Sequence, residues 1–366
     1  MTDLCREYGI SRKTGHKLWG RYQALGPAGL EDQPRAPKRI PHRTTPEAEA
    51  AILQLRGQHP TWGPKKLKEI LETELGHVFP AASTVGAVLR RNGFVSQRPQ
   101  RRRYVSRPTG LRDAAAANEV WCADYKGQFR LGNGSYCYPL TITDQHSRFL
   151  LACEGMAAIS EEQALEVFED VFRKCGLPTV MRTDNGVPFV TVGLAGLSKL
   201  NVYWMLLGIE HERSRPAHPQ DNGRHERMHR TLKLETTRPA RENLLQQQER
   251  FDSFVELFNG KRPHEALGLK PPASVYQSSS RFYPSRIPEP AYPLHDDVLY
   301  VSRKGFLRVP GRGSRYLSVA LANQPVGIRE EEDGRWLVSF MHLDLGHIEK
   351  SKNPGLVPLP PPPRGN

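Results

Sequence analysis

Three acidic residues have types and surroundings that suit one shared chemical role. Asp124 lies inside the apolar run VWCADYKGQF, Asp184 ends the run MRTD before Asn-Gly, and Glu226 lies one turn into a predicted helix. A carboxylate inside a strand is costly unless it is paired or faces open space. A strand middle, a strand end and a helix start can converge on one side of a sheet. Three carboxylates there would bind divalent cations, and two such cations can support phosphoryl transfer.

Successive β-like and helical runs predict the elements that must position these acids. VWCADYKGQF, SYCYPLTITDQ and FLLACEGMAA read as successive strands, with Gly132-Asn-Gly as a hairpin turn between the first two. A helix capped by Ser160 follows and ends near Gly176. Further elements are expected as a strand at TVMRTD, a helix over 194–207, a strand at GIEHERSR, and helices over 222–237 and 240–258. This order predicts an α/β domain with a mixed sheet over residues 118–277.

Basic residues are concentrated at the N-terminal end of the chain. Residues 1–110 contain 20 of the 52 Lys and Arg residues and 9 of the 39 acidic ones, a balance of +11. The remaining residues have a balance of +2. A basic segment joined to a nearly neutral body is typical of a nucleic-acid-binding arm. A charge bias that only aids solubility is the alternative.

Two short helical units are predicted within this basic region. Residues 1–30 read as a partial helix-turn-helix, with a turn at Gly9 and a second helix capped by Ser11. Residues 45–95 read as a second DNA-binding module of three helices, between basic linkers over 31–44 and 96–117. An ordinary helical hairpin is the alternative. The side chains expected to face DNA are all basic: Arg12, Lys13, Lys17, Lys65, Lys66 and Arg90.

The C-terminal region and the composition complete the expected organisation. A Ser/Pro linker over 278–294 precedes six short strand-like runs over 295–350, which predict a small β-barrel, and 351–366 is a Pro-rich tail. No run of apolar residues is long enough to span a membrane, and the N-terminus lacks the apolar core of a signal peptide. Five cysteines without a CxxC pair fit a reducing compartment, so a cytoplasmic protein is expected.

Five motifs together resemble the insertion-sequence transposases with a retroviral-integrase-type core, the DDE family. They are VWCADYKGQF, TITDQHSRF, RTDNGVPF, HPQDNGRHERMHRTLK and FNGKRPHEALGLKPPASVY, within about residues 118–276. The resemblance implies an RNase H-like catalytic core and makes Asp124, Asp184 and Glu226 the catalytic triad, binding two Mg²⁺ ions for which Mn²⁺ can substitute. The interval between Asp184 and Glu226 is longer than the common family pattern, so a short insertion is expected around 190–203.

The same resemblance implies a polynucleotidyl transferase, a DNA transposase. It would hydrolyse a phosphodiester at the element ends and transfer the 3′-hydroxyl into target DNA. The implied partners are double-stranded DNA, as terminal repeats and as target, and a second copy of the chain, because two ends must be paired. In a bacterial cell it would be associated with the nucleoid when bound to DNA. Arg230 and Lys233, on the helix face of Glu226, are expected to contact the DNA end; a solvated basic face is the alternative.

Several other interpretations stay open at this point. His225-Glu-Arg-Met-His229 matches the HExxH zinc-protease motif, with Glu226 as base and Glu249 as a conceivable third ligand. That interpretation leaves the other two acids unexplained, and otherwise the histidines contact phosphate or fill the core. A non-catalytic DNA-binding regulator and a nuclease that never joins ends are further alternatives. The chain begins at what would be the second helix of a helix-turn-helix, so a truncated, inactive copy is another.

Overall fold

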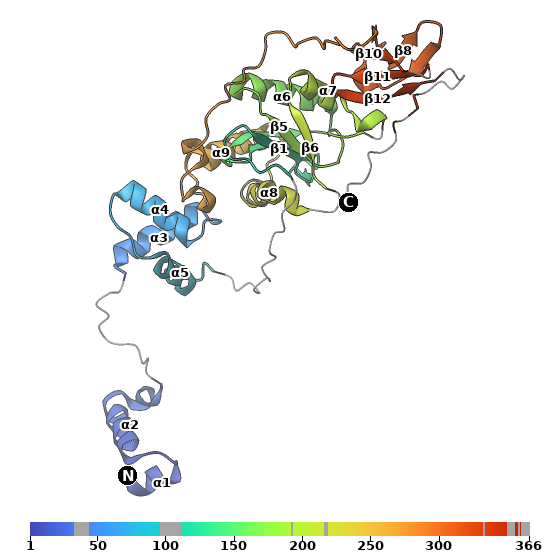
Figure 1. Ribbon diagram of the computed structural model, residues 1–366. Coiled ribbons are helices and arrows are strands. Elements are labelled where there is room, and N and C mark those ends of the chain that lie inside the picture. Colours follow the sequence, from blue (N-terminus) through green and yellow to red (C-terminus); the bar gives the residue numbers. More distant parts are fainter. Residues whose placement is uncertain are drawn as a thin grey trace. The chain divides into compact units, whose positions relative to one another are not determined.

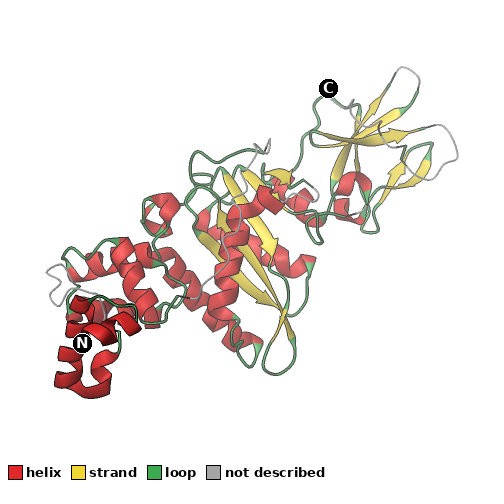
Figure 2. Cartoon of the chain, turned by 90° about the horizontal axis from the view of Figure 1, so that it is seen from below, coloured by secondary structure: helices red, strands yellow, loops and turns green. Residues whose placement is uncertain are grey.

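The computed structural model describes residues 1–32, 44–95, 111–191, 193–215, 219–331, 334–349, 356–357 and 359. The chain divides into two compact units, residues 1–49 and 50–366. Most of the predicted linkers at 31–44 and 96–117, and of the Pro-rich tail, lies outside the described residues. Figure 1 follows the elements along the chain, and Figure 2 separates helices from strands by colour. No helix in the described ranges is both long and apolar enough to cross a membrane.

The first unit is built on a helix pair that the sequence predicts. Helices α1 (Thr2–Glu7) and α2 (Arg12–Leu25) flank the turn at Gly9, and Ser11 caps α2 by accepting a hydrogen bond from the Thr14 amide. The two helices meet at Cys5 and Gly15, where a Cβ on the glycine would lie 2.3 Å from the Cys5 sulfur. Only glycine fits such an approach.

The three predicted helices of the second module are present. They are α3 (Pro46–Gln58), α4 (Pro64–Leu75) and α5 (Ala82–Arg91). Pro64 occupies the first turn of α4, where its missing amide costs nothing, and Gly76 ends that helix in the left-handed conformation. The buried apolar side chains of the module include Ile52, Trp62, Leu67, Val85 and Leu89.

A mixed sheet forms the centre of the second unit, as predicted, and it has six strands. Its path is β2-β3-β1-β5-β6, and β4 also pairs with β3. Strands β1, β5 and β6 are parallel, whereas β3 is antiparallel to both β1 and β4. The strands are β1 (Val120–Tyr125), β2 (Phe129–Arg130), β3 (Tyr136–Asp144), β4 (Leu150–Met156), β5 (Val180–Thr183) and β6 (Glu210–Arg213).

One predicted strand is in fact two. The run VWCADYKGQF contains β1, which ends at Tyr125, and β2, which begins at Phe129. The chain leaves the ladder of β1 at Lys126-Gly127-Gln128, so the hairpin at Gly132-Asn-Gly joins β2 to β3 instead of β1 to β3. β1 still pairs with β3, beside β5.

Helices cover both faces of the sheet. Helices α6 (Glu161–Cys175) and α7 (Lys199–Leu206) pack on the face that carries Trp121, whereas α8 (Gly223–Thr236) and α9 (Leu244–Gly260) pack on the opposite face. Figure 1 shows α6 and α8 on opposite sides of the strands. Two expected helices are shorter than predicted, since Ser198 caps α7 and Asn243 caps α9. Residues 194–196, within the interval expected to hold an insertion, form a separate 3-10 turn.

The C-terminal domain contains the six predicted strands, in two sheets. One sheet has the order β12-β11-β10-β7, the other is the hairpin β8-β9, and a bridge from Val301 to Leu307 links the two regions. These pairings do not close a ring within the described residues, so closure of a barrel stays a prediction. Leu197, Val202 and Met205 of the α7 region belong to the same apolar core. The strands are β7 (Asp297–Tyr300), β8 (Phe306–Val309), β9 (Gly313–Tyr316), β10 (Pro325–Glu330), β11 (Trp336–Phe340) and β12 (Leu343–Ile348).

Candidate active site

The three acids converge beside the carboxyl ends of two parallel strands. Asp124 lies near the end of β1 and Asp184 directly follows β5, and the register that pairs Val120 with Val180 places the two acids side by side. Burial, together with the negative charges of Asp184 and Glu226, raises the pKa of Asp124 to about 7, whereas Lys126 acts in the opposite direction. The structure therefore places the carboxylates of Asp184 and Glu226 close enough to Asp124 to disfavour its charged form.

A tight turn orients the carboxylate of Asp184. Its Oδ1 accepts a hydrogen bond of 3.0 Å from the Gly186 amide. A Cβ on Gly186 would lie 3.1 Å from Oδ2 of the same carboxylate. Asn185 donates a 2.7 Å hydrogen bond from Nδ2 to the Ser214 carbonyl, which fastens the turn after β5 to the end of β6. The Asp-Asn-Gly sequence thus holds the acid at the strand end.

Helix α8 supplies the third acid. Its N-terminal turn begins at Gly223 and presents Glu226 to solvent. Arg230 and Lys233 are also exposed, and their spacing of four and seven residues from Glu226 places all three on one helix face. The predicted shared face is therefore present, and its contact with DNA stays a prediction.

Two buried histidines anchor α8 to the sheet. His225 lies 2.8 Å from the hydroxyls of both Thr141 and Thr143, through Nε2 and Nδ1 respectively, and His229 Nε2 lies 2.6 Å from the Thr141 hydroxyl. Burial lowers the pKa of His225 to about 3 and lowers the pKa of His229 below its usual range, so both rings are neutral. The HExxH histidines are therefore buried packing residues of the helix–sheet interface.

The hydrogen positions in this network follow from the Asp124 carbonyl, which can only accept. Thr141 donates its hydroxyl hydrogen to the Asp124 carbonyl at 3.1 Å, so it can only accept from the two imidazole Nε2–H groups. His229 then presents an unprotonated Nδ1 to Asp124, 3.6 Å from Oδ2. Asp124, His225 and His229 each offer one atom that could bind a metal ion, and these three atoms lie within 4.8 Å of one another. Threonine hydroxyls already contact both nitrogens of His225, which argues against the zinc-protease arrangement.

Several residues at the site were not singled out from the sequence. Thr141 and Thr143 stand two apart in β3, so their period of two could have placed both on the face covered by α8. Lys126, two residues after Asp124, brings a positive charge to the acids. Asp144 accepts hydrogen bonds from the Ser147 amide in the turn after β3 and from the Asn118 amide just before β1.

The remaining predicted DNA-binding residues occupy three places. Arg12, Lys13 and Lys17 are exposed on α2 of the first unit, and Arg90 is exposed on α5. Lys65 forms an exposed ion pair of 3.0 Å with Glu265. Lys66 is half-buried and lines a pocket beside α8.

Comparison with known proteins identifies the domains of the chain. A family model for a homeodomain-like domain matches residues 14–89. Two models for an integrase core domain match residues 114–219 and 207–272. Asp124 and Asp184 fall within the first integrase-core match, and Glu226 falls within the second.

The relatives found include an insertion-element protein and retroviral polyproteins. An uncharacterised 39.2 kDa protein of insertion element IS476 from Xanthomonas euvesicatoria is 24% identical over 72% of this chain and 74% of its own length. The Gag-Pol polyprotein of baboon endogenous virus is 28% identical over 63% of this chain, which spans only 13% of that polyprotein. The HTLV-2 integrase catalytic core domain in complex with magnesium is 14% identical, with a TM-score of 0.36, over 44% of this chain and 99% of that one.

The fold and these matches define an integrase-core protein with an N-terminal homeodomain-like domain. Within that class, the comparisons support an insertion-sequence transposase with a DDE-type core. The resemblance seen in the sequence motifs is confirmed at the level of the family. The assignment of individual catalytic residues stays a prediction.

Proposed function

We propose that this protein is a DNA transposase. It would hydrolyse a phosphodiester at each element end and transfer the exposed 3′-hydroxyl to a phosphate of target DNA. The observation that supports this most directly is the convergence of Asp124, Asp184 and Glu226 inside the integrase-core matches, with a raised pKa at Asp124. Catalytic acids are often found where burial and like charges shift a pKa in this way.

The acids fit a site for divalent metal ions. The charges of Asp184 and Glu226 disfavour the charged form of Asp124, which a bound cation would reverse, and carboxylate oxygens are the ligands that Mg²⁺ and Mn²⁺ prefer. In the proposed arrangement Asp124, Asp184 and Glu226 would together hold two Mg²⁺ ions. Bound metal would activate the attacking oxygen and stabilise the leaving oxygen, so no covalent protein–DNA intermediate is required.

Other residues of the chain would position the acids and the DNA. The histidine–threonine network fixes the α8 backbone against β3 and so sets where Glu226 stands. Gly186 directs the Asp184 carboxylate. Lys126 supplies a cation beside Asp124 that can neutralise charge on a phosphate oxygen. Arg230 and Lys233 would contact the DNA end along the exposed face of α8.

The N-terminal unit would recognise the terminal repeats. Arg12, Lys13 and Lys17 are exposed on the capped helix α2, where they can reach a DNA groove and its phosphates. Arg90 and Lys65 would add phosphate contacts from the second helical module. Two ends must be brought together for transposition, so the working form would be a homo-oligomer, associated with the nucleoid when bound to DNA.

A branched DNA that mimics an element end joined to target provides the test. Purified protein is incubated with Mg²⁺ or Mn²⁺, and resolved, religated strands are measured for the native chain and for Asp184→Asn. We expect religation that the substitution abolishes, whereas Asp170→Asn, an exposed acid on α6, retains it.

Other outcomes identify the alternatives. Cleavage without religation would indicate a nuclease. Bound DNA with no metal-dependent reaction would indicate a regulator or an inactive copy. Peptide hydrolysis that survives Asp184→Asn but is lost in His225→Ala would restore the zinc-protease interpretation.

A further inference from the structure

A cationic pocket of about 470 Å³ opens beside the active site, on the α8 face of the sheet. Its basic lining comes from α4, from the turn after β3, from α8 and from the turn after α9. These side chains are Lys66, Arg148, Arg224, Arg227 and Arg262. His264 lines the pocket as a neutral ring, because burial and the neighbouring cations lower its pKa to about 3. None of the three acids lines the pocket, but Cys122 does, and it stands two residues before Asp124 in β1, about 7 Å along the strand.

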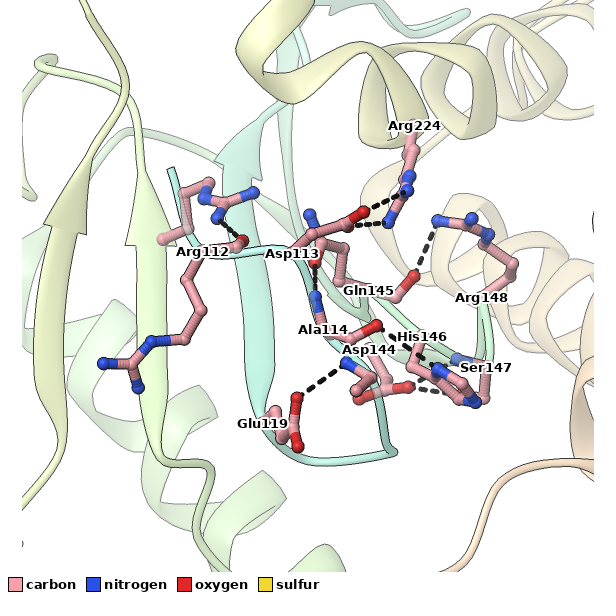
Figure 3. A network of polar contacts seen from close by, with 12 residues as sticks. Arg112, Asp113, Ala114, Glu119, Asp144, Gln145, His146, Ser147, Arg148 and Arg224 are labelled. Carbon is pink, nitrogen blue, oxygen red and sulfur yellow. Dashed lines mark hydrogen bonds and ion pairs between the residues drawn. The ribbon is translucent and has the colours of Figure 1, made fainter. Parts of the chain in front are cut away.

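Only part of this positive charge is neutralised. Arg224 is paired with Asp113 at 2.7 Å, as Figure 3 shows, and Arg262 is paired with Glu235 at 2.5 Å. Lys66, Arg148 and Arg227 have no carboxylate within ion-pair distance among the residues that the structure describes.

The two acids that line the pocket are already engaged. Asp144 is buried and accepts hydrogen bonds from the Asn118 amide and from the amide and hydroxyl of Ser147. Figure 3 shows the contact of Asp144 with Ser147. Glu265 pairs with Lys65 at 3.0 Å, on the surface. The pocket therefore keeps a net positive charge that its own acids do not balance.

The cations disfavour one another in the absence of a ligand. Burial, with the charges of Arg224 and Arg227, lowers the pKa of Arg148 to about 10, although Asp113 acts in the opposite direction. Burial, with the charge of Arg262, lowers the pKa of Lys66 to about 8, although Glu235 and Glu265 act in the opposite direction. A bound anion would favour the charged forms of both side chains and so raise both pKa values.

One feature independent of the charges points to a ligand. His264 has a buried Nε2 without a hydrogen-bond partner in the described part of the chain. A buried ring nitrogen left unpaired is costly, and in its N–H tautomer it could donate to an oxyanion in the pocket. Arg148 has a φ of +65°, in the turn that its amide closes onto the Asp144 carbonyl at 3.1 Å. Its side chain donates to the Gln145 carbonyl.

We propose that this pocket binds a phosphate group, held mainly by Arg148, Lys66 and Arg227. The phosphate could come from the backbone of a DNA strand or from a free phosphate ester. In the first case, which rests on the proposed function, the pocket would fix one strand beside α8 and so set the register in which a phosphodiester meets the three acids.

Arg148→Gly separates a ligand-binding role from a structural one. The substitution removes the charge and also relieves the positive φ, so the fold is kept or stabilised. Lys174→Gln removes one positive charge from the exposed surface of α6, on the other face of the sheet, and serves as the matched control. All measurements use the full chain in EDTA, so they do not depend on catalysis.

The first measurement is thermal unfolding with increasing inorganic phosphate against chloride of equal ionic strength. The second is the affinity for the branched DNA as a function of salt. Arg148→Gly should weaken DNA binding about tenfold and reduce the slope of log affinity against log salt by about 1. Lys174→Gln should change neither quantity.

The outcomes distinguish the two phosphate sources. A reduced salt slope assigns the pocket to DNA, whereas phosphate stabilisation lost in the variant, with unchanged DNA binding, assigns it to a free phosphate ester. Binding of both ligands unchanged in Arg148→Gly would overturn the proposal. If strand transfer fails while phosphate or DNA still binds in EDTA, the proposed function is rejected and the proposed phosphate site is retained.

Discussion

At the scale of the residue, the negative charge that Asp124 needs for its proposed role lowers the stability of the metal-free fold. Its pKa of about 7 lies above the ordinary value for an aspartate, so the unfolded chain gives up this proton more readily than the folded one. The stability that this group contributes is present below about pH 4 and is lost as the pH rises through about 7.

Asp124→Asn should therefore stabilise the metal-free protein at pH 8 while abolishing strand transfer. We expect a gain on the order of 2 kcal/mol in the free energy of unfolding, shrinking towards zero near pH 4. Urea unfolding in EDTA at several pH values measures it, with Asp170→Asn as the control at an exposed acid. An equal effect at pH 4 and pH 8 would show that the carboxylate charge is not the cause.

Gly186 offers a second test at the scale of the residue. The Cβ of Gly186→Ala would lie 3.1 Å from the Asp184 carboxylate, so the acid must move by a few tenths of an ångström. We expect strand transfer to fall about tenfold, because catalysis is sensitive to such displacements, while DNA affinity stays unchanged. Gly127→Ala, with no atom within 4 Å of the added Cβ, is the matched control. Full activity in Gly186→Ala would mean that the turn does not orient the acid.

At the scale of the element, the hydroxyls of β3 hold α8 in place. Thr141→Val keeps the side-chain shape but leaves the buried Nε2–H groups of His225 and His229 without an acceptor. We expect a loss of about 3 kcal/mol, and a smaller loss of about 1 kcal/mol for Thr143→Val, which removes only one contact. Equilibrium unfolding measures both losses. Equal losses for the two variants would contradict the proposed order of donors and acceptors.

The elements themselves could be read from the sequence because their signals are local. Ser11, Ser160 and Pro64 mark helix starts through contacts within a few residues, and apolar runs mark β3 and β4. The site could be read only in part. The three acids were recognisable from their motifs, but the placement of His225 against Thr141 joins residues 84 positions apart and needs the folded sheet.

At the scale of the whole molecule, Glu235 joins the second helical module to the catalytic core. Its Oε1 accepts from the Thr61 hydroxyl and, at 2.5 Å, from the buried guanidinium of Arg262, which also lies over the Trp62 ring. Glu235→Ala leaves the Arg262 charge unpaired, so we expect a loss of about 3 kcal/mol.

Hydrogen exchange of the full chain locates this loss. Amides of α4 and α5 should exchange faster in Glu235→Ala than in Glu256→Ala, which removes an exposed acid from α9. Unchanged exchange over residues 50–95 would show that the module is held by other contacts.

The apolar core of the C-terminal domain has a consequence for how such chains can diverge. The Ser/Pro segment over 278–294 looks like a natural domain boundary. However, Leu197, Val202 and Met205, which precede this segment in the chain, pack into the core of the C-terminal domain that follows it. A chain that ends at residue 277 would expose these three apolar side chains to solvent, and such a chain would be prone to aggregate. In a chimaera of two relatives, the C-terminal domain must therefore be exchanged together with residues 194–206, so the two segments are inherited as one block.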